Sequence, residues 1–381
     1  MKFGLFTYPS RPRWLPHVAA PQVFDEVVRQ AELAEACGFD SFWVGEHHFD
    51  EYWATCPNPL TLLAHLAART ERLILGTSVI LPALHNPIRL AEEIGLVDVL
   101  SHGRLIVGLG SGYLPFEFGG YGVTYDARRA NAWEHIDQLL AALRSGSVST
   151  ADGKPLRVYP ASSQQPHPPL LYCGYREESV RKAIRRGLYF MHPSSYSVAF
   201  LEQKMRRYHE LVREEGLDPA DFPHLTNRAG FVDLDSQRAA DIGVTNRQRA
   251  SDTHGRSVTG PATPEAKAIL DAEAPLLQRA GRDPAQAVVL AGSVTTDLLP
   301  TFENLRDEIG LFGSPDDVIP KLERLREMGT HLVLFSINQQ YLEPEYVATC
   351  MQLLGREVLP RFRDDGPLLL PNPQPARLAA A

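Results

Sequence analysis

The chain alternates short apolar segments with longer segments of helical periodicity, and this alternation restricts its fold more than any other feature. The apolar segments have the length and the β-branched and aromatic content of strands, which is typical of repeated strand–helix units around a parallel sheet. We predict eight such strands, in the order FGLFT (3–7), SFWVG (41–45), RLILGTSVI (72–80), RLIVGLGSGY (104–113), PLLYCG (169–174), LYFM (188–191), HLTNRAGFVDL (224–234) and LVLFSIN (332–338). Eight units without an internal linker predict one α/β domain over residues 1–362, a (β/α)8 TIM barrel with insertions.

Glycine and proline mark the ends of several predicted helices. Gly38 and Gly146 directly follow segments of helical spacing and predict left-handed caps at the carboxyl-terminal ends. Pro87 stands early in a third helix, which Gly103 ends. The last predicted helix runs near 343–362.

Some segments depart from this alternation. Residues 235–261 are polar and mixed, which predicts a long irregular connection and favours a lid. A helix at 264–281 and an additional strand at 287–292 follow. The tail, residues 363–381, is rich in proline, leucine and alanine without periodicity, and we expect it to be disordered or packed on a partner subunit.

Composition and charge exclude several classes of protein. The formal net charge of −8 disfavours nucleic acid or an anionic membrane as the main partner. The four cysteines form no CxxC pair, so neither a disulfide framework nor a zinc site is predicted. No segment reaches the roughly 18 to 20 apolar residues that a bilayer span needs. We expect a cytoplasmic protein without a membrane segment.

The segment GEHHFDEY, residues 45–52, places two histidines and several carboxylates directly after a predicted strand. His47 and His48 are chemically suitable metal ligands. Adjacent residues that leave a strand point to opposite sides, however, so one ion is poorly served by the pair. We therefore predict no metal site, and a single histidine at the barrel mouth could instead exchange a proton. Simple hydrogen bonding and packing of both histidines is the alternative.

Two further segments at predicted strand ends could bind an anion. The glycine-rich GLGSGY, residues 108–113, resembles a turn whose backbone N–H groups approach a phosphate, although ordinary turn glycines are the default reading. In CGYREES, residues 173–179, Arg176 stands just before a predicted helix, so its guanidinium and the helix amino terminus could grip the same phosphate. A solvated Arg176 that balances nearby glutamates is the alternative.

Five segments in order carry a family resemblance: MKFGLF, ACGFDSFWVGEHHF, LILGTSVILPALHNPIRLAEEIGLVDVLSHGRLIVGLGSGY, EFGGYG and GSPDDV. Together they resemble the bacterial luciferase-like flavin-dependent monooxygenases. The resemblance implies a (β/α)8 barrel that takes reduced FMN from a separate flavin reductase. It further implies reaction with O2 through a C4a-peroxyflavin and insertion of one oxygen atom into a small organic substrate.

The resemblance also implies the site residues. His47 matches the catalytic histidine of the family, a base near the flavin. The implied cofactor-binding residues are Thr77, Ser78, Val79, Ser111, Gly112, Tyr113, Gly174, Tyr175, Arg176 and Ser179. Ser78 and Val79 match the site of a non-prolyl cis peptide bond beneath the flavin ring. The luciferase α subunit has an arginine where this chain has Ser111, so we expect Arg176 to supply the cation.

Other functions on the same barrel stay open. A deazaflavin-dependent oxidoreductase would transfer a hydride without oxygen, and a non-catalytic paralogue would only bind flavin. The strong match around EHHF favours a monooxygenase. Family members are usually dimers or tetramers, so we also expect a homo-oligomer.

Overall fold

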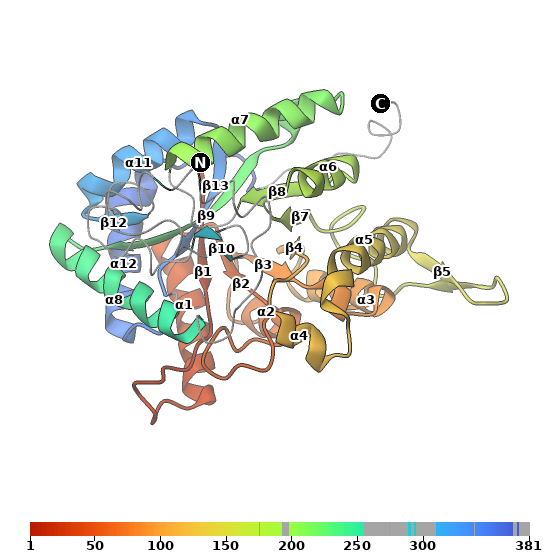
Figure 1. Cartoon of the computed structure of the whole chain (residues 1–381), viewed down its shortest axis with the longest axis horizontal. Coiled ribbons are helices and arrows are strands. Elements are labelled where there is room, and N and C mark those ends of the chain that lie inside the picture. The colour runs from red at the N-terminus through yellow and green to blue at the C-terminus, as the bar shows by residue number, and fades with distance from the viewer. Residues whose placement is uncertain are drawn as a thin grey trace.

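Eight parallel strands form a closed barrel in the computed structural model of the chain (Figure 1). The structure describes residues 1–174, 176–192, 198–254, 271, 274, 289–290, 293–294, 310–338, 340–368 and 372. The barrel strands are β1 (Lys2–Thr7), β2 (Ser41–Val44), β3 (Ile74–Ile80), β4 (Leu105–Leu109), β7 (Leu170–Cys173), β8 (Tyr189–His192), β9 (His224–Val232) and β13 (Thr330–Ser336). They pair in this order, and β13 pairs with β1 to close the ring. The predicted barrel and its eight strands are confirmed.

Helices surround the barrel on its outside (Figure 1). They are α1 (Ala20–Cys37), α2 (Pro59–Ala67), α3 (Pro87–Leu100), α4 (Pro115–Gly120), α5 (Arg128–Ser145), α6 (Glu177–Arg185), α7 (Val198–Glu214), α8 (Ser236–His254), α11 (Pro315–Glu327) and α12 (Pro344–Leu353). Gly38 and Gly146 end α1 and α5 in the left-handed conformation, as predicted. The chain continues from α12 in irregular helical turns as far as Arg361.

Two short strand pairs lie outside the barrel. The hairpin of β5 (Ser147–Ser149) and β6 (Pro155–Arg157) projects from the body at the right of Figure 1. A second small pair joins β10 (Val289–Leu290) and β11 (Ser293–Val294), so the predicted extra strand exists but is only two residues long. The helix predicted at 264–281 lies outside the described residues apart from single positions.

The predicted irregular connection at 235–261 is wrong for most of its length, because α8 covers Ser236–His254. Asp235 accepts hydrogen bonds from the backbone N–H groups of Gln237 and Arg238, which starts the helix. Gly243 made the segment look irregular, yet a Cβ there would lie 2.3 Å from the ring of Phe312. The glycine allows close packing of α8 on β12 (Leu311–Gly313), a strand that we did not predict. Residues 255–261 lie outside the described part, and a lid function stays a prediction.

Two apolar layers make up the core. Alternate strand residues face outward to the helices, as Phe3 and Leu5 of β1 do, while Phe6 faces the barrel interior. Trp43 fills much of that interior, and glycines make room for it. A Cβ at Gly76 would lie 2.2 Å from the Trp43 ring, so this glycine cannot be replaced without moving the indole.

Described residues of the tail contact the barrel of their own chain. The Asp364 carboxylate lies 2.5 Å from the amino group of Met1 and 3.1 Å from Lys2 Nζ. Leu368 joins the apolar barrel interior, and the Asn372 side chain bonds both backbone groups of Leu170. These contacts close the amino-terminal end of the barrel. Packing of the tail on a partner subunit stays a prediction.

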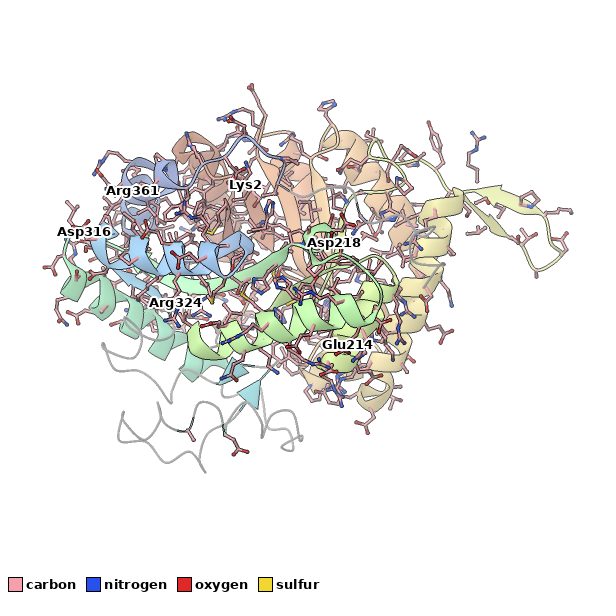
Figure 2. The ribbon with its side chains drawn as sticks, turned by 90° about the horizontal axis from the view of Figure 1, so that it is seen from above. Lys2, Glu214, Asp218, Asp316, Arg324 and Arg361 are labelled. Atoms are coloured by element: carbon pink, nitrogen blue, oxygen red, sulfur yellow. The ribbon has the colours of Figure 1, made fainter. Side chains whose placement is uncertain are left out.

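An ion-pair network ties α6 to α7 on the surface. Arg207 of α7 contacts Glu177 of α6 at 2.7 Å and Glu214 at 2.8 Å, and Glu214, which is labelled in Figure 2, also meets Arg181 of α6. A network holds its side chains better than an isolated exposed pair does. It fixes the direction of α6, whose first turn lies at the candidate site described next.

Candidate active site

The predicted site residues lie where β2, β3, β4 and β7 end. These four strands are parallel neighbours, so their carboxyl-terminal ends meet at one side of the barrel mouth. His47 follows β2, Ser78 and Val79 lie within β3, Ser111 follows β4, and α6 begins soon after β7. The structure therefore brings these segments together. Tyr175 lies outside the described residues.

The Ser78–Val79 peptide bond is cis, as the resemblance predicts. Glycines of both neighbouring strands surround it: a Cβ at Gly45 would lie 2.9 Å from the Ser78 carbonyl oxygen, and one at Gly110 would lie 2.6 Å from Val79 Cγ2. Larger residues do not fit, so the three strand ends approach closely here. The hydroxyl of Thr77 is occupied by the backbone of Gly108, at 2.8 Å and 2.9 Å, and holds β3 to β4.

His47 is paired with a buried carboxylate that comes from a distant part of the sequence. Its Nδ1 lies 2.9 Å from Oε1 of Glu117, which is 1% exposed and belongs to the short helix α4. The same oxygen accepts the backbone N–H of His48 at 2.9 Å. Within the described part of the chain, no hydrogen bond is made by Nε2 of His47, so this nitrogen is available to a bound molecule.

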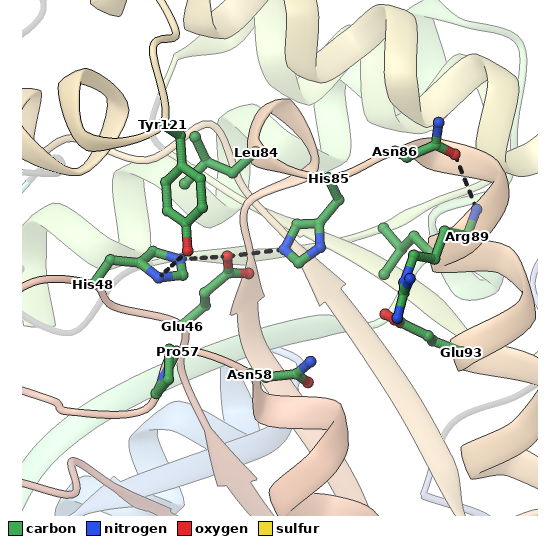
Figure 3. A pocket seen from close by; sticks show the side chains of 11 residues that line it. Glu46, His48, Pro57, Asn58, Leu84, His85, Asn86, Arg89, Glu93 and Tyr121 are labelled. Atoms are coloured by element: carbon green, nitrogen blue, oxygen red, sulfur yellow. Dashed lines mark hydrogen bonds and ion pairs between the residues drawn. The ribbon is translucent and has the colours of Figure 1, made fainter.

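His48 is held on the other side by a second buried carboxylate, Glu46. Glu46 Oε1 lies 2.7 Å from His48 Nε2 and 2.9 Å from His85 Nε2 (Figure 3). Its Oε2 accepts the Leu81 N–H at 2.9 Å. The hydroxyl of Tyr121 lies 3.1 Å from His48 Nδ1. Both ring nitrogens of His48 are thus engaged, which fits the expected opposite directions of the two histidines.

We call the three histidines and two carboxylates His47, His48, His85, Glu46 and Glu117 the mouth cluster. Burial raises the pKa of Glu46, but hydrogen bonds from the two histidines and the Leu81 backbone outweigh it and hold that pKa below its usual value. Burial lowers the pKa of His85, and the bond and charge of Glu46 outweigh it and raise that pKa. Glu46 is therefore an ionised, fully hydrogen-bonded carboxylate.

A pocket of about 250 Å³ opens beside the Glu46 side of this cluster (Figure 3). It lies between the segment after β2 and the start of α3, and its lining is mostly polar: Glu46, His48, Pro57, Asn58, Leu84, His85, Asn86, Arg89, Leu90, Glu93 and Tyr121. His47 is absent from this lining. The pocket therefore lies on the Glu46 side of the cluster, and His47 faces a different region of the barrel mouth.

Three hydroxyls meet on the opposite side of His47, where β4 and β7 end. Ser111 Oγ and the Tyr172 hydroxyl form a short hydrogen bond, and Ser179 also bonds Tyr172. The Tyr172 ring stacks on Trp133 at 4.4 Å, which fixes its hydroxyl in place. Burial raises the pKa of Tyr172, although the serine bonds and Arg129 oppose this, so the group is a neutral phenol. Ser111 and Ser179 are brought together through a residue that we did not predict.

Two arginines stand at the starts of the helices that flank these hydroxyls. Arg176 precedes the first turn of α6 and Arg129 stands in the first turn of α5, and the charges of both lower the pKa of Glu178. Arg129 also acts on Tyr172. The site therefore combines hydroxyl donors, two guanidinium groups and a helix amino terminus, which is an arrangement that suits an anion.

Aromatic side chains line the remaining wall near His47. The Tyr113 ring meets the His47 ring edge to face at 5.9 Å, and Tyr8 stacks on Trp53 at 5.0 Å. Burial, with the neighbouring Tyr8 and Glu117, raises the pKa of Tyr113 well above its usual value. Gly112 has a positive φ of 69° and packs against Phe118, so it shapes the turn that carries Tyr113.

The sequence could not reveal Glu117, Tyr172 and Arg129 as site residues. Glu117 stands 70 positions after His47, and only the fold brings the two together. The segment EFGGYG lies in this region, yet nothing in it indicates a partner for Glu117.

Among the described residues, no group of three or more histidine, cysteine, aspartate or glutamate side chains is arranged to hold a metal ion. None of the described helices combines the length and apolar content of a membrane span.

Residues 1–332 match the family described as luciferase-like monooxygenase. The chain belongs to this family. Among curated relatives of this chain, an uncharacterized protein of Sinorhizobium fredii is 35% identical over 192 residues, 49% of this chain and 54% of that protein. The alkanal monooxygenase alpha chain of the Kryptophanaron alfredi symbiont is 30% identical over 64% of this chain and 68% of its own. The oxygenase component of the flavin-dependent trigonelline monooxygenase of Acinetobacter baylyi is 27% identical over 49% and 52%.

The chain spans about half the length of the first two curated relatives, 54% and 47%. Solved structures agree over more of the chain. The monooxygenase RslO1 from Streptomyces bottropensis has a TM-score of 0.76 and 26% identity, and covers 95% of this chain and 100% of its own. The oxygenating constituent of 3,6-diketocamphane monooxygenase from Pseudomonas putida, in complex with FMN, has a TM-score of 0.73 and 21% identity over 95% and 98%.

Proposed function

We propose that this luciferase-like monooxygenase uses reduced FMN and O2 to transfer one oxygen atom to a small organic substrate. A separate flavin reductase would supply the reduced FMN. The main support is the convergence at one barrel mouth of a carboxylate-paired histidine, His47, and an anion-binding arrangement around Ser111 and Ser179. Relatives described as alkanal monooxygenase and as a flavin-dependent oxygenase component support the reaction class.

The residues at the mouth fit FMN through its phosphate. Ser111, Tyr172 and Ser179 offer hydroxyl donors, while Arg176 and Arg129 bring positive charge to the same place. Hydrogen bonds from charged donors to a phosphate are stronger than neutral ones. The phosphate would therefore sit between β4 and α6, with the ring system reaching toward β3. Backbone groups of Gly112 and Gly174, two other predicted contacts, stand at the strand ends beside this place.

His47 is the residue that we propose to handle a proton. Reduced FMN, when bound, would supply the electrons that activate O2. His47 has one ring nitrogen fixed on Glu117, and its side chain is 12% exposed, so the other nitrogen can hold or take up a proton in a place that excludes most water. The rings of Tyr113, Tyr8 and Trp53 offer an apolar wall for a planar cofactor and an apolar substrate.

The reaction class is tested by oxygen incorporation. The purified protein is supplied with FMN, a flavin reductase and NADH, and a panel of aldehydes, ketones and aromatic compounds is incubated under ¹⁸O₂. Mass spectrometry of the products should find one ¹⁸O atom per product molecule and none when the protein is left out. Substrate conversion that continues without O2 would contradict the proposal and favour the hydride-transferring deazaflavin alternative. Flavin binding without conversion would favour the non-catalytic paralogue.

The cofactor assignment is tested through its phosphate. Arg176→Ala should weaken FMN binding about 10-fold or more, because a charge-assisted hydrogen bond contributes roughly 1.5–3 kcal/mol. Riboflavin, which lacks the phosphate, should bind equally well to both proteins. Arg185→Ala, which removes an exposed arginine of the same helix, serves as the matched control. Equal loss of FMN and riboflavin would contradict a role of Arg176 at the phosphate.

A homo-oligomer, a dimer or tetramer, is also proposed. Helix α3 carries large apolar side chains that are about half exposed, Leu96 at 47% and Leu100 at 49%. Such residues are suited to a contact between α2 and α3 of two copies. Light scattering after size-exclusion chromatography should give a mass of two or four chains, and a monomer at micromolar concentration would contradict this.

A further inference from the structure

We infer that Glu117 is a positioning residue that keeps His47 in the tautomer protonated at Nδ1. The inference deepens the proposed function, because the protonation state of His47 matters to catalysis only if His47 handles a proton. The tautomer itself can be measured without any turnover.

The hydrogen-bond pattern around Glu117 gives the direction of the proton. A backbone N–H can only donate, and that of His48 points at Oε1 of Glu117 from 2.9 Å. Oε1 is therefore an acceptor. His47 Nδ1 lies 2.9 Å from the same oxygen, so the stable arrangement is an N–H on Nδ1 that donates to Oε1. Nε2 then carries the lone pair.

Burial makes this constraint strong. Glu117 is 1% exposed, and Oε2 has no hydrogen-bond partner within the described part of the chain. A buried carboxylate with so few donors binds the two that it has tightly, since each lost donor leaves charge without compensation. The nearby Tyr113 responds to this charge, because Glu117 contributes to the raised pKa of its phenol.

The neighbouring histidine shows that the effect is selective. His48 has both nitrogens engaged, Nε2 by Glu46 at 2.7 Å and Nδ1 by Tyr121 at 3.1 Å. His47 alone of the pair keeps a nitrogen without a hydrogen bond in the described residues. Two adjacent and chemically identical side chains therefore receive different roles from two different carboxylates.

The test is long-range ¹H–¹⁵N NMR of the histidine rings in the full-length, ligand-free protein. His47 is assigned by the signal that disappears in His47→Gln. The wild type should have a protonated Nδ1 and an unprotonated Nε2 in the neutral ring. Glu117→Ala should move His47 toward the Nε2-protonated form. Glu117→Gln keeps a side-chain oxygen for both donors and should retain the wild-type tautomer. Glu51→Gln, at an exposed carboxylate paired with Arg11, is the matched control and should change nothing.

The kinetic constants of the same variants provide a second test. In Glu117→Ala, kcat should fall about 10-fold or more with KM changed less than about twofold, and Glu117→Gln should recover part of kcat. A wild-type His47 protonated at Nε2, or a tautomer unchanged in Glu117→Ala, would overturn the inference. If Glu117→Ala does not fold, the test rests on Glu117→Gln and the wild type. The tautomer of the wild-type protein alone can contradict the inference. If the tautomers are as predicted but kcat is unchanged in the variants, Glu117 does position the His47 ring. That result would refute the role of His47 in the proposed function.

Discussion

Two groups of histidines lie in this barrel, and they differ in the charges beside them. The mouth cluster surrounds its histidines with two buried carboxylates, Glu46 and Glu117. In the barrel wall, His192 of β8 and His224 of β9 face each other instead, with His192 Nδ1 2.9 Å from His224 Nε2. We call these two residues the wall pair. The neighbours whose charged forms act on it are all basic residues, Lys204, His209 and Arg228.

The difference shows that burial alone does not make a histidine a proton carrier. Burial, together with the basic neighbours, lowers the pKa of His192 to about 3, and the pKa of His224 is also held well below its usual value. Glu46 instead overcomes burial and raises the pKa of His85. A buried carboxylate keeps a histidine able to hold a proton, whereas a histidine pair without one stays neutral.

The largest expected effect is on catalysis at the mouth cluster. His47→Ala should lower turnover about 100-fold or more, because a positioned general base contributes about that factor, and FMN binding should be retained. Steady-state assays with the flavin reductase measure turnover, and flavin fluorescence titration measures FMN binding. His17→Ala, at an exposed histidine, is the control. Unchanged turnover would remove His47 from the mechanism.

Glu46→Ala should come next, as a loss of stability. The substitution leaves His48 Nε2, His85 Nε2 and the Leu81 N–H without their acceptor in a buried place. We expect the free energy of unfolding to fall by about 2–4 kcal/mol, since each unsatisfied buried group costs roughly 1–3 kcal/mol.

Urea denaturation measures the effect of Glu46→Ala. Glu93→Ala, which breaks a largely exposed ion pair with Arg89, serves as the control and should cost less than about 1 kcal/mol. Equal effects of the two substitutions would mean that Glu46 is not the centre of the mouth cluster.

The wall pair should make the protein lose stability in acid. Below the unfolded pKa of about 6.5 the unfolded chain binds protons that the folded His192 and His224 do not, so stability is present above that pH and lost as the pH falls. Each histidine contributes a slope of at most about 1.4 kcal/mol per pH unit. The free energy of unfolding, measured by denaturation between pH 7.5 and 5, should therefore depend less on pH in His192→Asn than in the wild type. The same slope in both proteins would show that His192 already takes up protons in the folded state.

The smallest effect concerns His85 and has the opposite sign. Its pKa is raised in the folded state, so its contribution is fully present below about pH 6.5 and is lost as the pH rises through the folded pKa. His85→Asn should destabilise the protein by about 0.5–1 kcal/mol near pH 6 and by less near pH 8.5, because a single hydrogen bond contributes about that much. A larger loss at the higher pH would contradict the pairing with Glu46.

Much of the frame was predictable because local patterns determine it. Gly38 and Gly146 ended helices as expected, since few other residues adopt the left-handed cap conformation. Residues 236–254 were misjudged because the helix has few strongly apolar positions and contains Gly243. The packing of that glycine on Phe312 involves a residue 69 positions away, which no local pattern reveals.

The sequence by itself determined the order of strands and helices, the barrel and the loop that carries both histidines, because periodicity and turn residues act over a few positions. Only the tertiary structure decided which carboxylate each histidine meets. Glu117 comes to His47 from α4, the short helix after β4, and Glu46 turns to His48 and to His85 of the next unit. Such pairings depend on the parallel pairing of β2, β3 and β4, which brings strand ends together that are tens of residues apart.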